Sequence, residues 1–422
     1  MRFIQIVVII LLVFAFNNAK AQQADTLTLN IAQCQKIFNE QNLQLLSKQY
    51  DINIAKAQLI QARIIDNPSI YLEQNIFNSN NQKYFDVGYS GENIFQAKQL
   101  IHLAGQRNKR VNIQKINKEI SEYQFYDLLR TLNFQLNTSF YRIHFLLKSI
   151  DTYNYQILTF SSLQNALQNQ YNKGNISLKE LMRIKALVFA LQNEKLSFIN
   201  QVNSEQNSIK VLLGNKQTTF IKPVLDNNTL KNKQVSFGLK QLIDTAYANR
   251  SDARISENFV RLGQADLKYQ RSLGMPDASI GYVYDRQGSF IRDYSAISLG
   301  IDLPIFNRNQ GNIAMSKAKL EQSKKQNELY GVQLENDVMQ IWNKVILTDS
   351  LYQSFDVDFQ PNFEKVMLGM LDNYQRRNIS LIEFLDYYDT YKQNIIQFND
   401  LKTQRLNAFE ELNFTVGKAL IK

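Results

Sequence analysis

Apolar residues spaced three and four positions apart run through two long stretches without glycine or proline, residues 106–173 and 175–213. This spacing is typical of a coiled-coil seam. A continuous helix over the first stretch would extend about 100 Å at ~1.5 Å per residue. The two stretches therefore predict a helical hairpin that turns at residues 172–175. The predicted seam of its first helix is Phe125, Leu129, Leu132, Leu136, Ile143, Leu147, Ile150 and Ile157.

A similar pattern returns over residues 312–416, with its turn at residues 375–378. The first arm of this second hairpin is less regular because it contains Gly331, Pro361 and Gly369. Proline lacks the backbone N–H and its ring clashes with the preceding turn, so we expect a kink at Pro361.

Four shorter stretches alternate apolar and polar residues, which predicts strands over residues 69–78, 85–95, 278–287 and 294–304. Strands of about 10 residues suit a tilted transmembrane strand with lipid on one face and water on the other. Two ordinary hairpins resting on helices remain the alternative. If the strands enter lipid, four cannot close and open edges are not tolerated there, so copies of the chain must pool strands. Three copies would supply twelve. The expected apolar faces carry Ile70, Leu72 and Ile76; Phe85, Val87 and Tyr89; Ala278, Ile280, Tyr282 and Tyr284; and Ile297, Leu299, Ile301 and Leu303.

The chain also repeats itself. NISLKEL at 175–181 returns as NISLIEF at 378–384, and AQLIQARIIDNPSI at 57–70 aligns with ADLKYQRSLGMPDASI at 265–280. Collinear matches of this kind predict two copies of one unit. The expected organisation is a signal peptide (1–21), a first repeat (22–214, with β-hairpin 69–95 and helical hairpin 96–214), a linker (215–236), a second repeat (237–417, with β-hairpin 278–304 and helical hairpin 305–417) and a C-terminal tail (418–422).

The first residues read as an export signal. Arg2 precedes an apolar run over residues 3–16, and Ala19-Lys20-Ala21 is an A-x-A cleavage site. The apolar run is shorter than the ~20 residues that span a bilayer. The net charge of +10 is spread along the chain, which favours a solvated surface over a nucleic-acid partner. Cys34 is the single cysteine, so no intrachain disulfide is expected.

Enzymatic and metal-binding patterns are missing from the sequence. His102 and His144 stand far apart without a cysteine partner, so neither a metal site nor a cofactor is expected. No Gly-rich phosphate loop, GxSxG or HExxH motif occurs. We therefore expect a protein without catalytic residues.

The chain resembles the TolC family of outer-membrane efflux ducts. The resemblance rests on NPSIYLEQN before the first strand, LAGQRN and LPIFNRNQGN before the long helices, and the two hairpin turns YNKGNISLKEL and YQRRNISLIEF. It implies a homotrimer with a twelve-stranded β-barrel in the outer membrane and a twelve-helix α-barrel tunnel in the periplasm. It further implies a periplasmic adaptor protein and an inner-membrane RND pump as partners. Within the family, the chain looks most like the CzcC/CusC branch of heavy-metal efflux.

The resemblance also implies where function lies, because both NISL turns would form the periplasmic tip. It assigns the gate there to Tyr171, Glu180, Tyr374, Arg376, Arg377 and Glu383. It assigns adaptor docking to Asn175, Ile176, Ser177, Leu178, Asn378, Ile379, Ser380 and Leu381. The sequence departs from the family at Ile379, where a tip arginine is usual. Independently of the family, Ser177 and Ser380 with an acid three residues later predict helix capping boxes.

Two alternatives remain open at this point. The duct could serve drug or protein export rather than metal efflux. A protein of another class, a periplasmic coiled-coil scaffold or adaptor, would share the long helical hairpins but would lack the two amphipathic β-hairpins.

Overall fold

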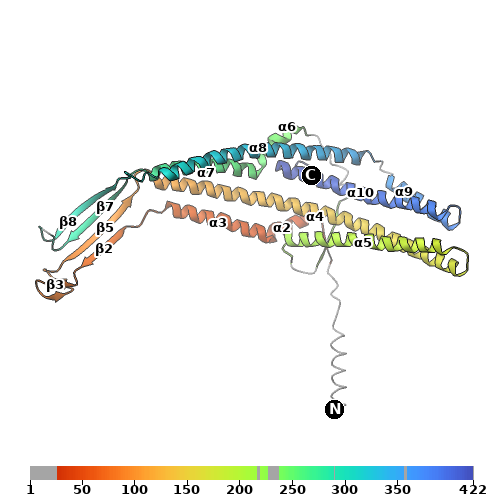
Figure 1. Cartoon of the computed structure of the whole chain (residues 1–422), viewed down its shortest axis with the longest axis horizontal. Helices are drawn as coiled ribbons and strands as arrows, with labels where there is room; N and C mark the ends of the chain where they lie inside the picture. Colours follow the sequence, from red (N-terminus) through yellow and green to blue (C-terminus); the bar gives the residue numbers. More distant parts are fainter. Residues whose placement is uncertain (1–25, 216–218, 227–236, 289, 356–358, 422) are drawn as a thin grey trace, which may run out of the picture. The chain divides into compact units, whose positions relative to one another are not determined.

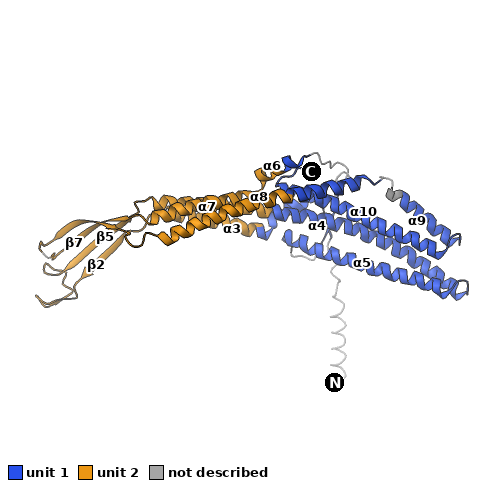
Figure 2. Cartoon of the chain, turned by 45° about the horizontal axis from the view of Figure 1, so that its top comes forward, with its two compact units in different colours: residues 1–44, 130–242, 338–422 blue, residues 45–129, 243–337 orange. Residues whose placement is uncertain are grey.

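The computed structural model describes residues 26–421 except 216–218, 227–236, 289 and 356–358. The predicted signal peptide and most of the predicted linker lie outside the described residues. The chain forms two compact units (Figure 2). Unit 1 comprises residues 1–44, 130–242 and 338–422, and unit 2 comprises residues 45–129 and 243–337.

Unit 2 contains a four-stranded antiparallel sheet in the order β2-β5-β7-β8 (Figure 1). The strands are β2 (Ser69–Gln74), β5 (Asn93–Ile101), β7 (Asp277–Asp285) and β8 (Tyr294–Asp302). β2 and β8 are the edges, and β5 pairs with β7 along eight residues, from Ile94 opposite Asp285 to Ile101 opposite Ala278. Two segments that lie far apart in the sequence therefore build one sheet.

The second predicted strand was placed wrongly. The paired strand is β5, which begins at Asn93, so Phe85, Val87 and Tyr89 precede it and form no part of the sheet. The first strand ends at Gln74, and a short extension follows in β3 (Phe77–Asn78) and β4 (Lys83–Tyr84). Asp86 accepts hydrogen bonds from Asn78 and from the Gly88 N–H, which favours a compact loop over a continued strand.

The helical part of unit 2 is built from α3 (Leu43–Arg63), α7 (Ser251–Leu273), α4 (Gln106–Asn172) up to Leu129 and α8 (Gln310–Gln353) up to Asp337. The first helical hairpin was predicted to begin at residue 96, but its first helix, α4, begins ten residues later at Gln106, because residues 96–101 belong to β5. Ile116 and Ile120 of α4 are buried against Ala265 of α7. At Gly263, a Cβ would lie 3.2 Å from the Leu320 backbone, so glycine permits the close approach of α7 and α8.

Unit 1 contains the two helical hairpins. In the first, α4 from Arg130 onward turns into α5 (Leu178–Leu212), and in the second, α9 (Phe359–Gln375) turns into α10 (Leu381–Val416). Both turns fall where the sequence predicted them. The kink expected at Pro361 is wrong in form, because α8 already ends at Gln353 and a separate helix, α9, begins at Phe359. Pro361 lies in the first turn of α9, where the missing N–H costs no helical hydrogen bond.

The remainder of unit 1 packs beside these hairpins. β1 (Thr26–Leu29) pairs in parallel with β6 (Phe220–Pro223), which occupies part of the predicted linker. α2 (Ile31–Gln41) starts with a capping box at Asn30, and the Asn42 side chain donates to the Leu212 carbonyl at 2.7 Å. α6 (Leu239–Asn249) begins in unit 1 and ends in unit 2.

The predicted seam of α4 is only partly correct. Leu132, Leu136 and Ile143 are buried as expected. Toward the turn, however, the most buried hydrophobic residues are Tyr153, Phe160 and Leu163, whereas Ile157 of the predicted seam is only partly buried against the same cluster. α4 packs against both α5 and α10 in this region, so its buried surface is wider than a two-helix seam.

Candidate gating and docking site

The two hairpin turns that carry the NISL sequences have the same backbone geometry. In the first, Gly174 adopts φ 75°, and the Asn175 N–H donates to the Gln170 carbonyl at 2.9 Å. In the second, Arg377 adopts φ 62°, and the Asn378 N–H donates to the Asn373 carbonyl at 2.9 Å. A left-handed residue followed by a hydrogen bond back across the last turn is a Schellman motif.

The asparagine of each turn adds a side-chain hydrogen bond. The Asn175 amide donates to Gln170 Oε1 at 2.7 Å, and the Asn378 amide donates to Asn373 Oδ1 at 3.0 Å. Both asparagines thus stabilise their own turn, which gives them a structural role beside the docking role predicted for them.

The predicted helix caps are present, and the two turns differ in one of them. Ser177 and Ser380 each accept a hydrogen bond at 3.3 Å from the backbone N–H of the acid three residues later. Only Glu383 closes the full capping box, by accepting the Ser380 N–H at 2.8 Å. This bond lowers the pKa of the exposed Glu383 carboxyl. The capping box predicted at Ser177 is therefore wrong in its second half, because no hydrogen bond joins Glu180 to the Ser177 N–H.

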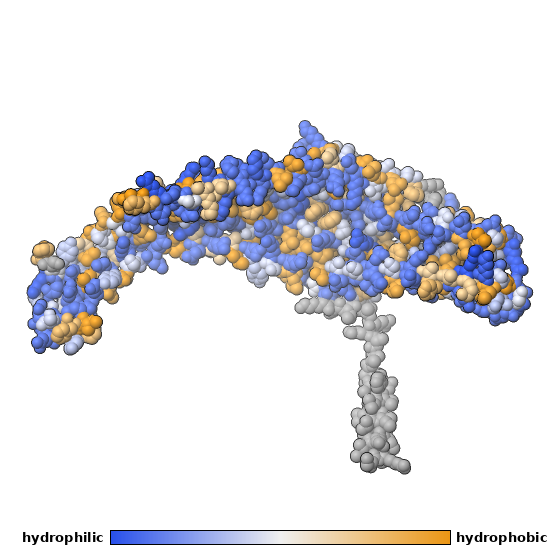
Figure 3. All heavy atoms as spheres, in the orientation of Figure 1, coloured by the Kyte–Doolittle hydropathy of each residue, from blue (hydrophilic) through white to orange (hydrophobic). Residues whose placement is uncertain are grey.

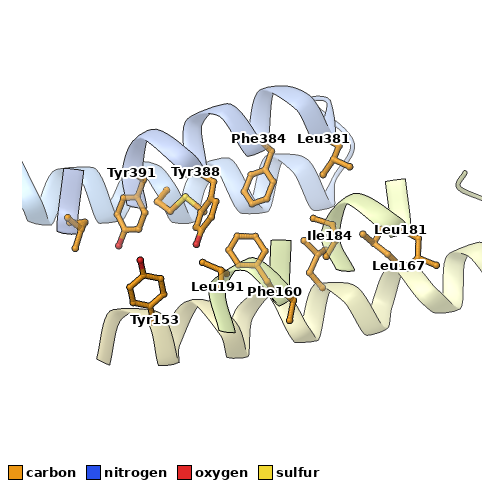
Figure 4. Close-up of a cluster of buried hydrophobic side chains, with 14 residues drawn as sticks. Tyr153, Phe160, Leu167, Leu181, Ile184, Leu191, Leu381, Phe384, Tyr388 and Tyr391 are labelled. Carbon is orange, nitrogen blue, oxygen red and sulfur yellow. The ribbon is translucent and has the colours of Figure 1, made fainter. Parts of the chain in front are cut away.

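Tyr374 is the best-packed of the predicted gate residues. Its ring stacks on Phe384 with 5.1 Å between centroids and 9° between planes. Phe384 is fully buried and contacts Phe160, so the stack joins the tip to the hydrophobic cluster that α4, α5, α9 and α10 share (Figure 4). Its partner in the first turn, Tyr171, is more exposed and has no such stack.

Charges from both hairpins meet around Tyr374. Burial is the main cause that raises the pKa of the Tyr374 phenol, the negative charge of Glu180 raises it further, and Arg377 opposes the shift. Glu180, Tyr374 and Arg377 all line a cleft of about 850 Å³ between the two turns. Arg376 does not point into this group, since it pairs with Asp372 of its own helix at 3.0 Å.

The residues predicted for docking divide into exposed and buried ones. Leu178 is 53% exposed, whereas Leu381, its partner by sequence repeat, is 7% exposed and belongs to the hydrophobic cluster. Ile176 and Ile379 are half-buried against the same cluster. The exposed apolar side chains that the sequence analysis missed are Met182 and Ile382. The spacing of apolar residues alone could not separate Met182 and Ile382 from core positions, because these helices bury apolar side chains on more than one face.

The sheet of unit 2 is the second unusual surface. The strand register places Leu72, Phe95, Tyr284 and Ser295 in one row across the four strands, and Ile280 opposite Leu299. This face is apolar and exposed, with Leu72 at 73% and Leu299 at 79%. The other face mixes polar and small residues with the apolar Ile94, Leu100 and Val283. The apolar side chains predicted for 278–303 therefore share one face, as expected. The polar and small residues opposite are Gln96, Lys98, Ser279, Gly281, Ser298 and Gly300.

Neither surface offers enzymatic chemistry. Among the described residues, no group of three or more His, Cys, Asp and Glu side chains is arranged to hold a metal ion. In the same residues, no helix combines the length and apolar content that crossing a membrane requires. The Cys34 thiol is buried in unit 1, and burial raises its pKa to about 11.

Comparison with known proteins gives a family match for part of the chain and a shared fold for nearly all of it. Residues 37–215 match the family described as outer membrane efflux protein. The structure resembles that of CusC, solved in a study of its folding and transmembrane channel formation, with a TM-score of 0.75, 14% identity and coverage of 95% of this chain and 96% of that one. It also resembles the CmeC outer membrane channel of Campylobacter jejuni, with a TM-score of 0.75, 12% identity and coverage of 92% and 86%.

Residues 37–215 thus match the outer membrane efflux protein family, and the chain shares the mainly helical fold of solved outer-membrane channels. A curated relative is the cobalt-zinc-cadmium resistance protein CzcC of Cupriavidus metallidurans, 19% identical over 398 residues, which cover 94% of this chain and 91% of the relative.

Proposed function

We propose that three copies of this chain join their sheets into one closed twelve-stranded sheet in the outer membrane. The observation that carries the proposal is the apolar face of the four-stranded sheet, whose exposed leucines and isoleucines need lipid or protein against them. The edges β2 and β8 present unpaired backbone groups, which lipid does not tolerate. Pairing β8 of one copy with β2 of the next satisfies both edges and leaves the polar face toward a water-filled interior.

Disulfide crosslinking tests this assembly. In a panel of double-cysteine variants, each variant carries Glu73→Cys in β2 and one cysteine in β8, such as Ser298→Cys. Under oxidising conditions these variants should give ladders of crosslinked dimer and trimer. The matched control is Gln96→Cys with Val283→Cys, which face each other within one sheet and should crosslink without a change in chain number. If every β2–β8 pair stays monomeric while the control pair forms, the proposed assembly is wrong.

We propose further that the two NISL turns form the periplasmic gate of the duct and the docking surface for a periplasmic adaptor. Glu180 of the first hairpin lines one cleft with Tyr374 and Arg377 of the second, so separating the hairpins would widen this cleft and weaken the electrostatic interaction across it. The stack of Tyr374 on Phe384 opposes that separation, and a partner that binds the separated form better would open the duct. Tyr171, Arg376 and Glu383 act in this proposal as supporting residues around the same turns.

The apolar side chains that remain exposed near the turns would supply the adaptor contacts. Leu178 and the newly found Met182 and Ile382 are each more than half exposed. Ser177, Asn175, Ser380 and Asn378 hold the turns in shape. Leu381 contributes through packing only.

We propose heavy-metal cation efflux, with an inner-membrane RND pump, as the transport role. The support is the similarity to CzcC over nearly the whole of both chains. Deleting the gene in its host should increase sensitivity to cobalt, zinc or cadmium, and a plasmid copy should restore tolerance. Unchanged metal tolerance with increased sensitivity to drugs or lost protein secretion would favour the alternative cargoes.

A further inference from the structure

A groove in unit 1, about 350 Å³ in volume, lies between α4 and α9 with α10 as its floor. It is lined by aromatic and aliphatic side chains, among them Tyr155, Phe160, Met367 and Tyr391. Tyr388 and Tyr391 of α10 point toward α4 in the close-up (Figure 4). The size is within the range of small-ligand sites.

A buried amide in this groove lacks a partner. Gln156 is 4% exposed, and its carbonyl oxygen accepts the Tyr388 hydroxyl at 2.7 Å. Its amide nitrogen has no hydrogen-bond partner among the described residues. A buried N–H group without a partner carries a desolvation penalty, which a ligand with an acceptor atom would remove.

The charges at the groove are negative. Asp151 and Glu364 line it, from α4 and α9 respectively, and no basic residue does. Glu364, Tyr155 and Tyr391 line the same groove. Burial is the main cause that raises the pKa of Tyr391 to about 12, and Glu364 and Tyr155 raise it further. Carboxylates beside electron-rich ring faces favour a cation with an apolar body.

We propose that this groove is a binding site for a small organic cation with an aromatic or aliphatic body and a hydrogen-bond acceptor. The cationic end lies near Asp151 and Glu364, the body packs on Tyr155 and Tyr391, and the acceptor receives the free Gln156 N–H. The proposal goes beyond the gate and the metal cargo, and it concerns other residues than those of the hairpin turns.

Benzoylcholine is a suitable probe because it combines a ring, an ester carbonyl and a quaternary ammonium. The control ligand is 2-(benzoyloxy)ethanesulfonate, which has the same ring and ester with an anion instead. Ligand-observed NMR titration of the assembled protein in lipid nanodiscs, with empty nanodiscs subtracted, should show saturable benzoylcholine binding. The sulfonate should bind at least about 10-fold more weakly. Equal binding of the two would overturn the proposal.

A matched pair of variants locates the site. Asp151→Asn should weaken benzoylcholine binding by about 3- to 10-fold. Asp386→Asn removes the same charge from an exposed position of α10 that does not line the groove, and it should leave binding unchanged. Equal weakening in both variants, or in neither, contradicts the assignment.

A second copy of the chain is the competing occupant. Tyr155→Cys places a thiol at a position that is 58% exposed, while the natural Cys34 is fully buried. Rapid reaction with a maleimide in the assembled protein is expected. If this thiol is protected in the assembled protein without ligand, another chain covers the groove and the proposal is wrong.

Discussion

Arg377 adopts a left-handed backbone conformation at φ 62°, whereas the first turn has Gly174 at the equivalent position with φ 75°. A side chain with a Cβ is disfavoured there by about 1 kcal/mol, so the second turn keeps an arginine at a cost to stability. Its neighbour Glu180 lies across the cleft on the other hairpin. This cost is consistent with a role for the guanidinium that glycine could not fill.

Arg377→Gly should therefore stabilise the second turn by about 0.5–1 kcal/mol, because glycine relieves the backbone strain but loses more entropy on folding. Amide hydrogen exchange of residues 374–381 measures this locally, and slower exchange is expected. Gly174→Arg is the reciprocal variant and should speed exchange in the first turn. Faster exchange in Arg377→Gly would contradict the strain argument.

Glu383 makes the first turn of α10 sensitive to pH. Its pKa is lowered from the ordinary 4.5, mainly by the hydrogen bond from the Ser380 backbone N–H. A lowered carboxyl pKa means that the stabilisation is present above pH 4.5 and is lost as the pH falls through the lowered value.

Exchange at the start of α10 should thus be faster in Glu383→Gln than in wild type at pH 7, and the two should converge as the pH falls below the lowered pKa of Glu383, after correction for intrinsic rates. The start of α5 has no such box, so it serves as the internal control. A difference between variant and wild type that persists at low pH would rule out the carboxylate as the cause.

At the scale of helices and strands, buried polar contacts fix which helix packs against which. Arg405 of α10 donates to Asp349 of α8 at 2.7 Å, with side-chain exposures of 3% and 12%. The Arg405 guanidinium also lies 4.3 Å from the Tyr352 ring centroid. Removing one partner of a buried pair leaves an uncompensated charge.

Asp349→Asn is accordingly expected to destabilise unit 1 by about 3 kcal/mol, measured by chemical denaturation. The exposed pair Arg254 and Glu257 provides the comparison, because Glu257→Gln should cost less than about 1 kcal/mol. Similar losses from both substitutions would mean that burial does not set the strength of the α8–α10 contact.

The two faces of the sheet lead to a prediction of membrane assembly. Leu299→Lys places a charge on the apolar face and should cost about 2–4 kcal/mol if that face meets lipid near the bilayer centre. Ser298→Lys places the same charge one residue away on the polar face and should be tolerated. The yield of heat-resistant oligomer in outer-membrane fractions measures both. Equal yields would argue against lipid on the Leu299 face.

These elements also show what the sequence could predict. The helices, both turns and the strands β7 and β8 followed from periodicity. In β7 and β8, apolar residues recur at every second position around Ile280 and Leu299. The strand at 93–101 did not, because Asn93, Gln96, Lys98 and Gln99 hide its alternation and the apolar Phe85 and Val87 mimic it. Its identity comes from pairing with β7, a contact nearly two hundred residues away.

At the scale of the whole molecule, polar side chains cover most of the helical surface in view, with apolar ones interspersed (Figure 3). The sequence predicted the positions of both turns, but it did not predict which of their side chains are buried and which are exposed. Leu381 and Leu178 are equivalent in the sequence repeat, yet Leu381 is buried and Leu178 is exposed. Leu381 packs in the hydrophobic cluster of unit 1, and Leu178 lies outside it. The groove at Gln156 likewise depends on three helices meeting and left no signal in any one of them.

The most direct test of the account is the single-channel conductance of the protein in planar lipid bilayers. Wild type should form a small, rarely open channel, and Tyr374→Ala with Glu180→Ala should open more often and conduct more. Tyr50→Ala with Glu257→Ala, two exposed positions outside the turns, should behave as wild type. A tip variant indistinguishable from wild type, in protein shown to be folded and assembled, would contradict the gate at the NISL turns.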